Sequence, residues 1–108
     1  MTKRPDLMQR LMLLRHDPEL VEELLVEAVQ GDTDAQYGLG LVYAEGRGVE
    51  QDQIEAYAWL CVAMLQGDPE AENLRDVIML SLTAEQTHTA AARAGQLVVQ
   101  IEQQRPRH

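Results

Sequence analysis

Apolar side chains recur along the chain at the three- and four-residue spacing of helices, and no stretch has the strict alternation that is typical of a strand. Glycine or proline stands between most of the apolar stretches, where these residues end one helix or begin the next. The pattern predicts an all-α protein with helices at residues 6–15, 18–30, 34–45, 53–66 and 69–80, and a sixth that opens at the capping box of residues 83–86.

The junctions before the third and the fifth predicted helix are alike. Gly31 and Asp32 recur 36 residues later as Gly67 and Asp68. A period of this size is typical of stacked pairs of helices. Two residues are candidates for the N-cap of the third helix. Thr33 fits the first position of a capping box, whereas Asp32 is the residue that recurs 36 positions later.

The fourth predicted helix is apolar on nearly all sides through the run AYAWLCVAML. A helix without a polar face has to be covered on both flanks, so we expect neighbours on each side of it. Gly38 and Gly40 of the third helix each cost about 1 kcal/mol relative to alanine, which predicts that another helix approaches closely there. Trp59 is expected to fill the volume that remains between the two helices.

Length and charge narrow the class of partner. The chain of 108 residues is long enough for a single domain with a modest core, and its net charge is −9. This charge argues against nucleic acid, which needs a cationic surface, and favours a basic or mixed-charge protein partner. Between Asp17 and Glu102, seventeen acidic side chains and three arginines leave a net charge of −14, so both ends of the chain are basic. This separation of an acidic middle from basic ends is compatible with self-association and also with a monomer.

Cys61 is the only cysteine, so no intramolecular disulfide can form. Neither a secretory signal nor an apolar run of membrane-spanning length is recognisable, and the prediction is a cytoplasmic protein. No basic side chain is adjacent to Cys61 in the sequence, and its apolar neighbours predict a buried, unreactive thiol.

A dense set of small, glycine and aromatic positions covers the third and fourth helices and the turn between them. These positions are Ala35, Leu39, Gly40, Tyr43, Gly46, Gly48, Val49, Asp52, Ala56, Trp59, Ala63 and Gly67. In this pattern the chain resembles the Sel1-like repeat, an α/α solenoid unit akin to the tetratricopeptide repeat. The resemblance covers one full repeat with a degenerate half repeat on each side, and it departs at Arg75 and Asp76, which stand where Leu39 and Gly40 would recur.

The resemblance implies an α/α superhelical stack of about three helical hairpins in a single domain, residues 1–108. Its core repeat is expected at about 32–67, a degenerate hairpin at 5–31 and capping helices at 69–103. It also implies a protein–protein interaction adaptor without catalytic residues, cofactor or metal.

In stacked helix pairs the first helix of each pair usually lines the concave face. The predicted contact stripe therefore follows the third and fifth helices, through Asp34, Tyr37, Gly38, Leu41, Glu45, Leu74 and Val77. The alternative is that these side chains pack against the terminal helices, because short solenoids need their apolar faces covered.

Three functions are compared on this basis. The favoured one is a scaffold that binds a protein partner through a helical face. The others are a homo-oligomer that completes its own solenoid, and an adaptor held on an anionic membrane by the basic N-terminal helix, which the acidic body disfavours. An enzyme is the weakest hypothesis, because no candidate nucleophile has a general base at a suitable spacing in the sequence. Glu85 and His88 have the spacing of only one half of a two-metal site.

Overall fold

The computed structural model describes residues 18–104, and the helix expected at 6–15 lies outside that range. All regular structure in the described part is α-helical, which confirms the predicted all-α class. The helices are α2 (Pro18–Val29), α3 (Thr33–Glu45), α4 (Gln53–Leu65), α5 (Pro69–Met79) and α6 (Ala84–Gln104).

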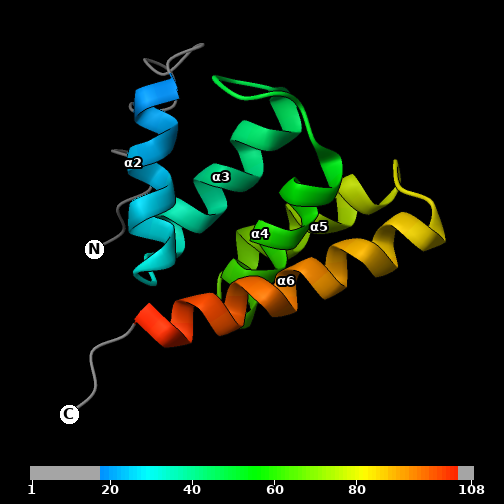
Figure 1. The fold of residues 1–108 in the computed structure, drawn as a ribbon. Coiled ribbons are helices and arrows are strands. Elements are labelled where there is room, and N and C mark those ends of the chain that lie inside the picture. Colours follow the sequence, from blue (N-terminus) through cyan, green and yellow to red (C-terminus); the bar gives the residue numbers. More distant parts are fainter. Residues whose placement is uncertain (1–17, 105–108) are drawn as a thin grey trace.

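Helix α4 lies at the centre of the arrangement and packs against α3, α5 and α6 (Figure 1). Helix α2 packs against α3, and the 21-residue α6 runs along α4 far enough to reach α2 as well. A helix that is apolar nearly all round needs neighbours on every flank, and α4 has them.

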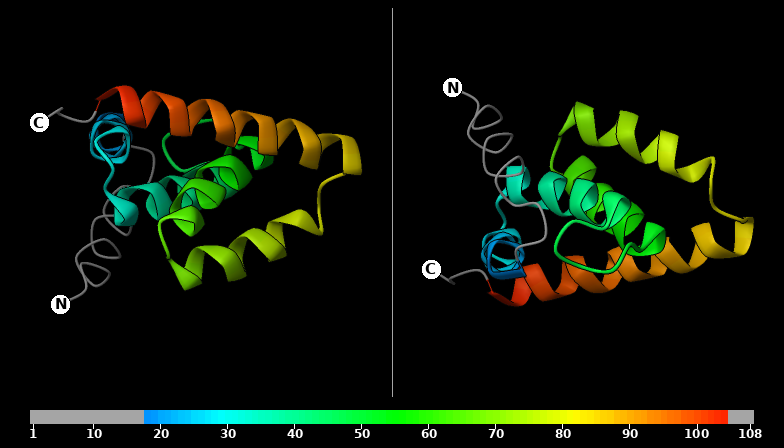
Figure 2. Two further views of the ribbon diagram at one scale, coloured as in Figure 1. Left: turned by 90° about the horizontal axis from the view of Figure 1, so that it is seen from below. Right: turned by 90° about the horizontal axis from the view of Figure 1, so that it is seen from above.

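Helices α5 and α6 do not form the third packed hairpin that the sequence led us to expect. They diverge from the turn at residues 80–83 and flank α4 on different sides (Figure 2). The predicted buried stripe of α6 is nevertheless used, since Ala90, Ala94, Leu97 and Ile101 are all buried.

The two similar junctions are built in the same way. Gly31 and Gly67 have φ angles of 102° and 94°, a region that favours glycine, and each ends a helix. Asp32 then caps α3 by accepting a hydrogen bond of 3.0 Å from the Ala35 amide, and Asp68 caps α5 likewise. The structure thus settles the open choice of cap in favour of Asp32.

A hydrogen-bonded chain joins the junction between α2 and α3 to the end of α4. The Nε2 of Gln36, which is fully buried, donates to the Ala28 carbonyl at 3.0 Å. Its Oε1 accepts from Gln66 Nε2 at 2.9 Å, and the Thr33 hydroxyl donates to Gln66 Oε1 at 3.0 Å. A buried amide is costly unless it is paired, so this network fixes the relative position of three helix ends.

Trp59 fills the centre, as expected, with 1% of its surface exposed. Its indole N–H has no hydrogen-bond partner, so packing alone holds the ring. The other large side chains that are fully buried around it come from α2, α3, α4 and α6 and are Leu24, Leu39, Leu60, Leu97, Gln36, Val42 and Val62.

Helices α3 and α4 come together at a glycine. A Cβ built on Gly40 would lie 2.5 Å from Leu60 Cδ2 and 2.6 Å from Leu60 Cγ, so a side chain there would collide with a fully buried leucine. At the matching position of α5, 36 residues later, stands Asp76, which pairs with Arg75 at 2.7 Å. A charged side chain at this position keeps a following helix from packing on α5 as α4 packs on α3, which accounts for the different course of α6.

The substitution Gly40→Ala tests this close approach. We expect it to lower the free energy of unfolding by about 1–3 kcal/mol, because Leu60 has no free space into which it could move. Gly95→Ala is the matched control, since a Cβ at that exposed site in α6 meets nothing within 4 Å. It should raise stability by about 0.5–1 kcal/mol. Urea unfolding of both variants measures the difference, and equal midpoints would contradict the close-approach account.

Candidate interaction surface

The structure divides the predicted contact stripe into buried and exposed parts. On α3, Tyr37 keeps 8% of its surface exposed, Gly38 is buried, and Asp34 and Leu41 are half-buried. Leu41 packs against the hydrophobic core. Only Glu45, at the end of α3, is exposed, and its carboxylate pairs with Arg47 Nε at 3.0 Å.

The two residues of the stripe on α5 differ in the same way. Leu74 is half-buried and packs against the core, whereas Val77 is 62% exposed. Leu80, which ends the helix three residues later, is 86% exposed, so α5 presents an apolar pair to solvent. Helices α3 and α5 both pack on α4 but not closely on each other, so the stripe is not one continuous surface.

A groove that the sequence did not reveal lies between the second halves of α4 and α6. It has a volume of about 230 Å³ and is lined by Val62, Leu65, Gln66, Val98, Ile101 and Glu102. Leu65 is 68% exposed at its edge, whereas Val62 and Ile101 are buried in its floor. The one signal in the sequence was Leu65 itself, an apolar residue two positions before Gly67.

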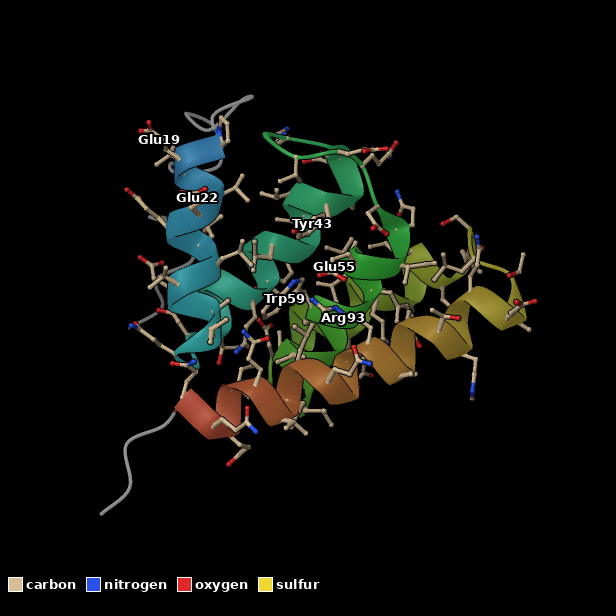
Figure 3. The ribbon with its side chains drawn as sticks, in the orientation of Figure 1. Glu19, Glu22, Tyr43, Glu55, Trp59 and Arg93 are labelled. Atoms are coloured by element: carbon tan, nitrogen blue, oxygen red, sulfur yellow. The ribbon has the colours of Figure 1, made fainter. Side chains whose placement is uncertain are left out.

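On another side of α6, a polar cluster joins α3, α4 and α6. Arg93 donates from Nε and Nη2 to the two carboxylate oxygens of Glu55, at 3.0 and 3.1 Å. Figure 3 shows Tyr43 and Trp59 near this pair. Burial raises the pKa of the Tyr43 phenol, Glu55 and Asp52 raise it further, and Arg93 opposes the shift. The cluster holds α6 on α4.

The sole cysteine lies between α4 and α5 and is half-buried. Burial raises the pKa of the Cys61 thiol more than Arg75 lowers it, which favours the unreactive protonated form. Burial also raises the pKa of the neighbouring Tyr57. Arg75 Nη1 lies 2.8 Å from the Met64 sulfur, so this cluster too serves to pack the two helices together.

Within residues 18–104, no group of three or more His, Cys, Asp and Glu side chains is placed to hold a metal ion. Glu85 and His88 are both exposed, and the capping box at the start of α6 pairs Thr83 with Gln86 in both directions. None of the described helices is both long and apolar enough to span a bilayer.

Comparison with known proteins gives one likeness. No protein-family model matches the chain, and no solved structure matches it. Over 85 residues, 78% of its length, the chain is 36% identical to the alginate biosynthesis protein AlgK of Azotobacter vinelandii. These residues cover 17% of AlgK, so the chain is similar to one segment of a much longer protein. The likeness and the all-helical fold are compatible with a helical repeat protein.

A double-mutant cycle on Arg93→Gln and Glu55→Gln measures how strongly the polar cluster holds α6. Because the Arg93 side chain is 37% exposed, we expect a coupling free energy of about 0.5–1 kcal/mol that shrinks as salt is added. The control is the more exposed pair of Arg47 and Glu45, which are two positions apart in the sequence. Its coupling free energy should be smaller. Urea unfolding at two salt concentrations gives both values, and stronger coupling in the control pair would contradict this role.

The raised pKa values of Tyr43, Tyr57 and Cys61 predict a loss of stability at alkaline pH. The folded chain keeps these protons after the unfolded chain has released them, at about pH 8.5 for the thiol and 10 for the phenols. The free energy of unfolding should therefore fall as the pH rises through and above that range. Urea unfolding at stepped pH under reducing conditions measures the slope, which Cys61→Ala and Tyr57→Phe should both reduce. An unchanged slope in both variants would refute the assignment.

Proposed function

We propose that this chain is a Sel1-like, tetratricopeptide-like repeat module that binds another protein through its helical surface and catalyses no reaction. The observation that carries the proposal is the set of large apolar side chains that the packed helices leave in solvent. These are Val26, Leu65, Val77, Met79, Leu80 and Val99. Exposed apolar pairs and grooves on a soluble helical scaffold are typical of surfaces that another protein covers.

The repeat assignment is supported by the two equivalent junctions at Gly31 and Gly67. In this proposal α3 and α4 form the one full repeat, α2 ends a degenerate repeat before it, and α5 begins the next. Helix α6 is then a closing helix that covers α4 in place of a further repeat. The polar side chains that could suggest chemistry are already engaged in holding helices together, as with Arg93 and Glu55. The enzyme class therefore has no support among the described residues.

The likeness to AlgK supports a shared module and does not extend to a shared task, because the chain covers only 17% of that protein. The proposed compartment is the cytoplasm, since the lone, half-buried Cys61 suits a reducing environment. The acidic balance supports a partner with basic or mixed charge.

Two matched substitutions test the proposed function. Val77→Asp places a charge on the predicted contact stripe, and Val99→Asp places the same charge at a comparably exposed valine of α6, 56% against 62%. Both variants should keep the urea midpoint of the parent, because neither side chain is in the core. In affinity capture from the source cells, the partner should be lost with Val77→Asp and kept with Val99→Asp. Capture of no specific protein by the parent would refute the function, and equal capture by both variants would refute the contact stripe.

A further inference from the structure

The groove between α4 and α6 has a buried apolar floor and one exposed apolar wall. Val62 and Ile101 are 2% and 3% exposed, whereas Leu65 at the rim is 68% exposed. Its volume of about 230 Å³ is below the range of roughly 300–1,000 Å³ that encloses drug-sized ligands. A space of this size and apolar character suits a few aliphatic side chains better than a small molecule.

One lining residue at the end of α4 is held by hydrogen bonds before anything binds. Gln66 donates to Gln36 Oε1 and accepts from the Thr33 hydroxyl, so both ends of its amide are already held. A side chain that is already held lowers the entropy cost of binding. The Gln66 side chain therefore does not have to be ordered when an occupant binds.

Charge indicates which occupant fits. Residues 18–104 carry sixteen acidic side chains against three arginines, a net charge of −13. Each arginine is paired within the chain, Arg47 with Glu45, Arg75 with Asp76 and Arg93 with Glu55, and none lines the groove. Glu102 contributes a carboxylate to the lining itself. A basic segment is attracted to such a surface, whereas the same face of a second copy is repelled.

We propose that the groove of Val62, Leu65, Gln66, Val98, Ile101 and Glu102 binds an amphipathic helix of another protein, with aliphatic side chains at three- and four-residue spacing and lysine or arginine beside them. Its aliphatic anchors enter between Leu65 and Val98, and its basic side chains are attracted by Glu102 and by the net negative charge of residues 18–104. This inference rests on the proposed function and adds a second surface, apart from the contact stripe at Val77, together with its partner chemistry.

Two synthetic peptides serve as probes of the full-length chain. Both carry leucines at helical spacing, and the remaining positions are lysine in one and glutamate in the other. The lysine peptide should bind at least about tenfold more tightly than the glutamate peptide, and this preference should shrink as salt is added. Fluorescence anisotropy of the labelled peptides measures both affinities.

Leu65→Asp and Val99→Asp locate the binding site. Both residues are exposed on helices, at 68% and 56%, and both substitutions add the same negative charge. If the groove binds the peptide, Leu65→Asp weakens the lysine peptide about tenfold although the new charge attracts it, and Val99→Asp leaves the affinity unchanged. Unchanged urea midpoints show that both variants are folded.

Four results would overturn the proposal: no binding of the lysine peptide, equal binding of the two peptides, equal effects of the two substitutions, or a dimer in light scattering that Leu65→Asp dissociates. The last result would assign the groove to a second copy. The proposed function is judged separately, because capture of a partner that depends on Val77 would leave it standing when the groove fails.

Discussion

An α-helix without a polar face cannot be left in water, and in this protein that constraint falls on α4. Its buried residues include Ala56, Tyr57, Ala58, Trp59, Leu60, Val62 and Ala63, which face in nearly every direction around the helix axis. Three helices are needed to cover such a surface, and α3, α5 and α6 supply them. Close contact with α3 is available only because Gly40 leaves room for Leu60, so one missing side chain sets the distance between the two central helices.

Polar groups then fix how the covering helices are placed. The buried Gln36 amide, which would be costly if unpaired, bonds to Ala28 and to the exposed Gln66 amide and so holds the ends of α2, α3 and α4 together. At the surface, Arg93 and Glu55 hold α6 against α4 through two hydrogen bonds. These polar side chains are thus engaged in structure, while several apolar side chains and a strong negative charge remain at the surface.

Two of the places where apolar side chains remain exposed have different origins. On α5, Val77 and Leu80 are exposed because α6 packs on α4 and not on α5, and the charged Asp76 stands beside them. Between α4 and α6 a groove remains because α6 follows α4 without filling the space beside Leu65 and Val98. The similarity to a segment of AlgK is compatible with a module of packed helices, because such a module can form part of a longer chain.

The sequence determined the helices, their caps and the burial of α4, because glycine, aspartate and apolar spacing act over one or two turns of chain. It placed the helix ends at Gly31 and Gly67 and the ring of Trp59 in the core, all as the structure has them. Only the tertiary structure decided the course of α6, the burial of Tyr37 and the groove beside Leu65. An apolar stripe shows which face of a helix is to be covered, but the neighbour that covers it, and the space left uncovered, depend on how several helices fit together at once.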